Sequence, residues 1–126
     1  MKKNIIATDK APAAVGPYSQ GVHIGDLVFT SGQIPINPAT GNLAAGSIED
    51  QTRQAILNLK AVLEAAGSSL AQVIKTTVFI TDMGNFSKMN AVYASYFAEP
   101  FPARSCVQVG ALPKGAEVEI EAVALA

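Results

Sequence analysis

The 126-residue sequence is long enough for one folded domain, spanning residues 1–126, that needs no metal or disulfide to bury a core. Charged residues make up only 15% of it, against about 25% in an average soluble domain, which predicts that part of the surface is buried against another chain. The net charge is −1 and no basic run follows Lys2-Lys3, so the sequence lacks the concentrated positive surface that nucleic-acid binding requires.

The first third of the chain is predicted to form short strands joined by loops. Residues 3–7 form a candidate strand, and a loop with two prolines follows over residues 11–17. Gly25-Asp26 separates two apolar runs, residues 22–24 and 27–30, and a two-residue connection with glycine first is typical of a β-hairpin.

A long helix is predicted after residue 46. Ser47 is a good N-cap, and Asp50, three residues later, forms a weaker relative of a capping box. Gly67 supplies the C-terminal stop. The residues with helical spacing between these signals are Ile48, Ala55, Ile56, Leu59, Val62, Leu63 and Ala66.

The remaining chain predicts a strand, a second helix and two further strands. Residues 73–81 are rich in Val, Ile, Thr and Phe, which favours a strand. Gly84 and Asn85 open a helix whose apolar stripe is Phe86, Met89, Tyr93, Tyr96 and Phe97. Residues 104–109 and the cleanly alternating residues 117–125 form the last two strands.

This order predicts an α+β fold in which two helices pack on one face of a single sheet of about six strands. The opposite face would then carry apolar residues such as Phe29 or Val78 and would be left uncovered. Burying that face in an oligomer agrees with the low charge content.

Several polar residues stand where the pattern expects apolar ones. Arg104 shares a strand face with Cys106 and Gln108, and it is either a solvated edge-strand residue or an anchor that grips a carboxylate with two hydrogen bonds. Asn90 lies beside the apolar stripe of the second helix, where its amide either caps a backbone group or faces a ligand.

Three carboxylates, Glu117, Glu119 and Glu121, share one face of the last predicted strand. Such a row is usually a solvated face. If an oligomer buries the sheet face, however, some of these carboxylates lie in a cleft, and a carboxylate held there can act as a general base towards water.

The single cysteine and the single histidine do not form a metal site, and no phosphate-binding glycine loop is present. We interpret Cys106 as a small buried hydrophobe, with a catalytic thiol as the minor alternative, and His23 as a surface residue. One cysteine suits a reducing compartment, and no segment is long enough for a signal peptide core or a membrane span, so we expect a cytoplasmic protein with no membrane partner.

Several sequence motifs are spread along almost the whole chain. The N-terminal half carries Gly16-Pro17-Tyr18-Ser19-Gln20-Gly21 and Thr30-Ser31-Gly32-Gln33-Ile34-Pro35. The middle carries Lys75-Thr76-Thr77-Val78-Phe79 and Met89-Asn90-Ala91-Val92-Tyr93. The C-terminal part carries Pro102-Ala103-Arg104-Ser105-Cys106-Val107, Leu112-Pro113 and Val118-Glu119-Ile120-Glu121-Ala122. In this order and spacing the motifs resemble the Rid family, also called the YjgF family, and are most similar to its RidA branch.

The resemblance implies a chorismate-mutase-like fold, a homotrimer with sites at the subunit interfaces, and deamination of 2-aminoacrylate, 2-iminopropanoate and 2-iminobutanoate without a cofactor. It implies that Arg104 holds the substrate carboxylate, that Glu119 activates the attacking water, and that the backbone at Cys106 bonds to the reacting centre. The residues that the resemblance implies as further pocket lining are Tyr18, Ser31, Gly32 and Asn90.

The sequence departs from the family pattern in the short stretch 98–101 and at Gln108 and Ala111, which bear on the pocket rim and on specificity. Two other functions stay open at this point. One is a regulatory protein that binds a small carboxylate without converting it. The other is RNA cleavage or inhibition of translation, against which the low pI of about 5.7 counts.

Overall fold

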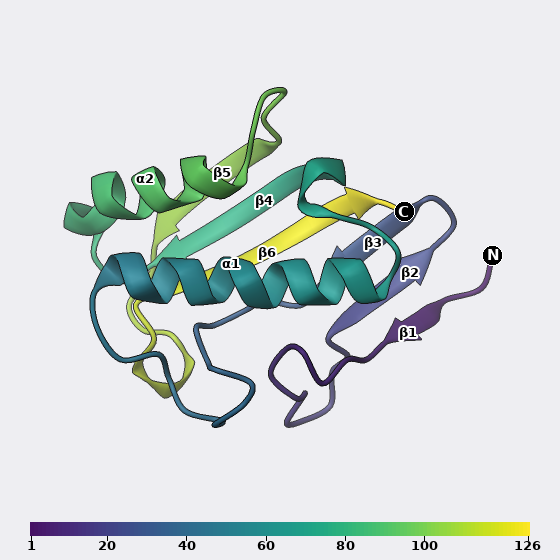
Figure 1. The fold of residues 1–126 in the computed structure, drawn as a ribbon, viewed down its shortest axis with the longest axis horizontal. Helices are drawn as coiled ribbons and strands as arrows, with labels where there is room; N and C mark the ends of the chain where they lie inside the picture. The colour runs from purple at the N-terminus through teal and green to yellow at the C-terminus, as the bar shows by residue number, and fades with distance from the viewer.

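The computed structural model describes all residues, 1–126. The chain forms a six-stranded mixed sheet with two α-helices on one face (Figure 1). The strand order is β1-β2-β3-β6-β4-β5, in which β4 and β5 are parallel and all other neighbours are antiparallel. This arrangement confirms the predicted α+β class. The elements are β1 (Asn4–Ile6), β2 (Gly21–Ile24), β3 (Leu27–Thr30), α1 (Ile48–Ala65), β4 (Val73–Ile80), α2 (Phe86–Tyr96), β5 (Ala103–Gln108) and β6 (Val118–Leu125), with 3-10 turns at Leu70–Gln72, Met83–Asn85 and Pro113–Gly115.

The ends of α1 are set by the residues that the sequence indicates. The Ser47 side chain accepts a hydrogen bond from the backbone N–H of Asp50, and the Asp50 carboxylate accepts one from the backbone N–H of Ser47. The capping box is therefore complete rather than a weak relative of one. At the other end Gly67 has a φ of 82°, a left-handed conformation that favours glycine.

The second helix, α2, begins at Phe86, two residues later than the sequence predicts, because a 3-10 turn occupies Met83–Asn85. Two side chains hold the first two residues of this turn. The Asp82 carboxylate accepts from the backbone N–H of Gly84, and the side-chain oxygen of Gln108 accepts from that of Met83 at 2.7 Å. Gln108 therefore ties the start of α2 to the end of β5.

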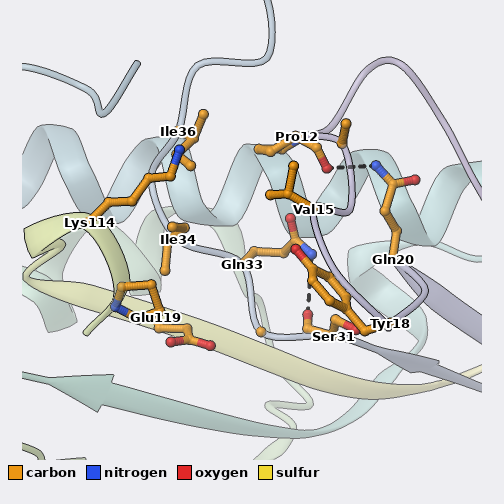
Figure 2. Close-up of a pocket in the computed structure, with 13 residues that line it drawn as sticks. Pro12, Val15, Tyr18, Gln20, Ser31, Gln33, Ile34, Ile36, Lys114 and Glu119 are labelled. Atoms are coloured by element: carbon orange, nitrogen blue, oxygen red, sulfur yellow. Dashed lines mark hydrogen bonds between the residues drawn. The ribbon is translucent and has the colours of Figure 1, made fainter. Parts of the chain in front are cut away.

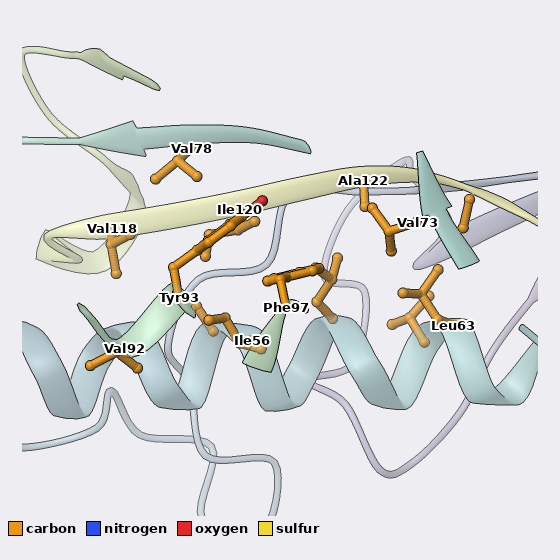
Figure 3. Packing of buried hydrophobic residues seen from close by; sticks show 14 of the residues in the cluster. Ile56, Leu63, Val73, Val78, Val92, Tyr93, Phe97, Val118, Ile120 and Ala122 are labelled. Atoms are coloured by element: carbon orange, nitrogen blue, oxygen red, sulfur yellow. The ribbon is translucent and has the colours of Figure 1, made fainter. Parts of the chain in front are cut away.

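The core lies between the helices and one face of the sheet, where side chains of α1 and α2 meet those of β4 and β6 (Figure 3). Alternation along β6 puts Val118 and Ile120 into this core. The prediction that Val78 lies on the uncovered face is wrong, because Val78 is fully buried under the helices. Its neighbour Phe79, which has the opposite parity, points to the other face.

The uncovered face of the sheet carries apolar side chains, as predicted for Phe29, whose side chain is 43% exposed. The strand register aligns a row of apolar residues across β1, β2, β3 and β6 on this face: Ile5, Val22, Phe29 and Val123. A continuous apolar row on an open sheet face is unusual for an isolated chain. Neither helix is long and apolar enough to cross a membrane.

Candidate active site

The predicted site residues fall into two groups on opposite faces of the sheet. Tyr18, Ser31, Gly32 and Glu119 line one cavity of about 520 Å³ (Figure 2). Asn90 and Arg104 line a second cavity of about 380 Å³ between α2 and β5. Cys106 follows Arg104 by two residues on the same strand and packs against the core. The structure therefore brings the residues together in two sets, and no single cavity of the chain contains both.

Glu119 is the one carboxylate among the residues that line the first cavity. It alternates with the buried Val118 and Ile120 of β6, so its side chain points to the uncovered face. Burial raises the pKa of the Glu119 carboxyl, and the nearby charge of Glu121 raises this pKa further. Its side chain lies over Gly32, where the Cβ of any other residue would overlap the carboxylate. Gly32 is therefore needed for this close approach.

Backbone and hydroxyl groups beside Glu119 are held in fixed positions. The backbone N–H of Ser31 donates to the carbonyl of Gln20 at 2.9 Å, and the Ser31 hydroxyl donates to the carbonyl of Ser19. The backbone N–H of the next residue, Gly32, has no partner within the chain. This N–H lies beside the carboxylate and is free to bind a ligand oxygen.

The row of three carboxylates predicted on β6 is reduced to two. Glu117 precedes the strand, and its carboxylate accepts a hydrogen bond from the side chain of Gln51 on α1 at 3.3 Å. The prediction that Glu117 shares the face of Glu119 and Glu121 is therefore wrong. Glu117 lies on the side of the sheet that faces α1, because its backbone N–H also donates to the side-chain oxygen of Gln51, near the start of that helix.

The second cavity is built around the Arg104 guanidinium. One of its N–H groups donates to the side-chain oxygen of Asn90 at 2.7 Å, and its carbon lies 4.7 Å from the centre of the Tyr93 ring. The Tyr93 hydroxyl is in turn hydrogen-bonded to Thr76 at 2.7 Å. Arg104 forms no ion pair, because Asp50–Arg53 is the one salt bridge in the chain. A half-buried guanidinium with unused donors can receive a carboxylate.

The position of Cys106 argues against a reactive thiol. Its side chain is half-buried, and burial raises the pKa of the thiol despite the opposing effect of Arg104. The thiolate form is therefore disfavoured. The strand that carries it, β5, lies at the edge of the sheet, so alternate backbone groups along it lack a ladder partner within the chain.

Gln33 and Lys114 are among the lining residues of the first cavity for which the sequence indicated no role. Gln33 is 5% exposed, pairs with Ile120 through both backbone groups, and donates from its side chain to the Ser31 carbonyl at 3.2 Å. The signal in the sequence is that Gln33 is a polar residue at the start of the otherwise apolar stretch 33–36. Lys114, which has a positive φ of 59°, lies at the cavity rim, and nothing in its local pattern indicates this position.

Comparisons with known proteins agree over the whole chain. A family model described as endoribonuclease L-PSP matches residues 8–126. An Escherichia coli protein named 2-iminobutanoate/2-iminopropanoate deaminase is 51% identical over 123 residues, which cover 95% of each chain. The structure of Escherichia coli TdcF with bound serine is 51% identical, with a TM-score of 0.93 and 98% of each chain covered. A Yersinia pestis member of the Rid family is 52% identical, with a TM-score of 0.96 and 99% and 100% of the chains covered.

The chain therefore belongs to the endoribonuclease L-PSP family, which is the Rid (YjgF) family that its sequence motifs indicate. The names within this family differ, since a Pyrococcus horikoshii protein that is 55% identical is called only a RutC family protein. The relatives therefore agree in family and fold, and their names differ in the activity that they state.

Proposed function

We propose that this protein hydrolyses reactive enamine and imine acids, such as 2-aminoacrylate, 2-iminopropanoate and 2-iminobutanoate, to 2-keto acids and ammonia. One observation carries the proposal. The chain presents an unpaired guanidinium on one face of its sheet and a desolvated carboxylate on the other. These are the two charged groups that imine hydrolysis of an acid requires, one to anchor the substrate and one to activate water. The deaminase name of the Escherichia coli relative supports it.

The chemistry needs no group beyond these residues. Arg104, held by Asn90, binds the substrate carboxylate with two parallel hydrogen bonds. Glu119 takes a proton from the water that attacks the C=N carbon and returns it to the nitrogen, which gives a carbinolamine. Glu119 then takes the hydroxyl proton of this intermediate and passes it to the nitrogen, so that the C–N bond breaks and the keto acid and ammonia form. The raised pKa of Glu119 suits both steps, because a carboxylate with a raised pKa accepts a proton more readily and can then donate it to the nitrogen. The free N–H of Gly32 and backbone at Cys106 bond to the reacting centre, while Tyr18 and Ser31 complete the wall.

A second copy of the chain has to complete the site, because the Arg104 cavity and the Glu119 cavity lie on opposite faces of one sheet. We propose that the uncovered face, with its apolar row from Ile5 to Val123, packs against neighbouring copies in a homotrimer. Separating the copies would expose apolar surface worth about 25 cal/mol per Å². Sedimentation should therefore give one species of about 39 kDa, three times the 13.0 kDa chain. A stable and active monomer contradicts the shared site.

A coupled assay tests the activity. An amino-acid oxidase generates the imine, and its disappearance is followed with and without the purified protein. Faster decay with the wild-type chain, and not with Arg104→Ala at the same concentration, is the expected result. A decay rate equal to the uncatalysed one in the presence of correctly assembled protein contradicts the proposal.

The second candidate is a regulatory protein that binds small carboxylates without converting them. The structure of TdcF with bound serine supports it, since serine carries the same carboxylate and amino group. The two candidates differ in one measurement, because a binding protein shows saturable binding of 2-ketobutyrate together with an unchanged rate of imine decay. RNA cleavage, which the family description names, finds less support because the net charge of −1 offers little to neutralise phosphates.

A further inference from the structure

The cavity that contains Glu119 has a polar end and a mostly apolar end, here called the apolar end (Figure 2). Ser31 and Glu119 lie on its lower side in this view, and Pro12, Val15 and Ile36 lie on its upper side, where the amine of Lys114 ends beside Ile36. If the carboxylate and the imine carbon of the substrate lie at the polar end beside Glu119, the side chain of the substrate extends towards the apolar end. This end is made by irregular chain, namely residues 11–18 and 33–36, outside the regular strands. Its shape must therefore be held by other contacts.

Gln20 holds the first of these segments. Its side chain is 5% exposed. The Gln20 side-chain oxygen accepts from the backbone N–H of Thr8 at 2.7 Å, and its amide nitrogen donates to the carbonyls of Pro12 at 2.8 Å, Thr8 at 3.0 Å and Ala11 at 3.4 Å. Its backbone carbonyl accepts from Ser31 at the polar end. One residue therefore connects the apolar wall to the groups beside Glu119.

Asn58 on α1 holds the second segment. Its side chain is 1% exposed, and its amide nitrogen donates to the carbonyls of Ile36 at 2.8 Å and Ile34 at 3.0 Å. Its side-chain oxygen accepts from Gln54 at 2.9 Å, so all hydrogen-bonding groups of this amide are used. The carbonyls of Ile34 and Ile36 would lose these partners if the amide were removed.

We infer that Gln20 and Asn58 are positioning residues that fix the apolar end of the cavity and thereby set which side chains the site accepts. The inference rests on the proposed function for the direction in which the substrate lies. Asn58 does not line the cavity, whereas Gln20 lines it at the edge where it is bonded to Pro12. Each holds a segment that lines the cavity, through hydrogen bonds to the backbone carbonyls of that segment. Loss of either amide lets its segment move, which weakens the binding of long apolar side chains and leaves the polar end intact.

The test compares Gln20→Met and Asn58→Leu, which keep side-chain size but remove the hydrogen bonds, with Ser68→Ala. Ser68 is a matched control, because its buried hydroxyl donates to the Leu125 carbonyl away from this cavity. For the leucine-derived imine we expect KM to rise by about tenfold, with kcat within about twofold of wild type. For the alanine-derived imine KM should change by less than about threefold. Unchanged selectivity, or an equal loss of kcat for both substrates, overturns the inference.

Two further measurements keep the test independent of folding and of the proposed reaction. Gln20→Glu keeps the acceptor for Thr8 and replaces the donating nitrogen by a carboxylate oxygen that faces the carbonyls of Thr8, Ala11 and Pro12, so it should show the same selectivity change, or a larger one, if Gln20→Met does not fold. Hydrogen exchange at the Thr8 amide should be accelerated in Gln20→Met and unchanged in Ser68→Ala. If the wild-type protein proves not to be a deaminase, the ratio of affinities for 4-methyl-2-oxopentanoate and pyruvate replaces the KM ratio. A ratio equal to that of wild type in both variants then overturns the inference by itself.

Discussion

The shape of the Arg104 guanidinium, and not only its charge, suits it to bind a carboxylate. Arg104 uses one N–H on Asn90 and leaves the rest of its planar fork for a carboxylate. Arg104→Lys should therefore lose most of the activity, because an ammonium cannot make two parallel hydrogen bonds, and Arg104→Ala should cost about 2–5 kcal/mol of transition-state binding. The measurement is kcat/KM in the coupled assay. Arg53→Lys, at an exposed residue of α1, is the matched control and should behave as wild type. Near-normal turnover by a folded Arg104→Lys variant would show that the arginine is not the anchor.

Glu119 and Glu121 offer a comparison of two carboxylates on one strand face. Glu119 lies in the cavity, and Glu121 is exposed beside it. Glu119→Gln should lower kcat by about 10²–10⁴-fold, since the amide keeps the shape and cannot take a proton from water. Glu121→Gln should retain the wild-type rate at neutral pH. Equal losses in the two variants would contradict the assignment of the base.

The same pair predicts a pH dependence. Burial, and secondarily Glu121, raises the pKa of Glu119, and the base works only when ionised. Activity is therefore full above this raised pKa and falls as the pH drops through it, so the acid limb of kcat/KM should lie above the ordinary range for glutamate. Glu121→Gln removes one cause of the raised pKa and should move the limb to lower pH. A limb that stays in place at low ionic strength contradicts the electrostatic coupling.

At the scale of elements, the ends of α1 are set locally. Ser47 and Asp50 satisfy each other's backbone N–H groups, and the further side-chain partner of Asp50 is Arg53 on the same helix, so the helix start depends on neighbours in sequence. Ser47→Ala should lower the free energy of unfolding by about 1 kcal/mol. Urea unfolding at fixed protein concentration measures this loss, and Ser87→Ala on the exposed side of α2 serves as the control. A loss no greater than that of the control would mean that tertiary packing alone fixes the start of α1.

The strands differ in how well their faces could be predicted from sequence. In β6 apolar and polar residues alternate, and the faces of Val118, Glu119 and Ile120 follow from that pattern. In β4 the face of Phe79 also carries Lys75 and Thr77, so the alternation favoured Val78 as the side chain that faces the helices, and the expectation for Val78 overlooked this signal. Glu117 was misplaced for a different reason, because its partner Gln51 lies 66 residues away in sequence.

The candidate site was predictable as a set of residue types and not as an arrangement. The unusual polarity of Arg104 and Glu119 is visible in the sequence, and so is the glycine beside the serine at position 31. Their separation onto two faces follows from the strand register, since Arg104 pairs with Thr76, which is buried under the helices, and Glu119 pairs with Phe79, which has the opposite parity. The buried amides Gln20 and Asn58 were not predicted, because their partners are backbone carbonyls of irregular segments, which leave no periodic signal.

At the scale of the whole molecule, the placement of Arg104 and Glu119 on opposite faces has a consequence for mixed assemblies. In the proposed homotrimer each chain offers its Arg104 to one neighbour and its Glu119 to the other, so the contacts would be head-to-tail and would close into a ring of three. Chains carrying Arg104→Ala and chains carrying Glu119→Gln are each inactive alone. Any mixed ring contains one junction at which an intact arginine meets an intact glutamate. Co-refolding equal amounts should therefore restore about a quarter of the wild-type activity, by complementation between two inactive proteins.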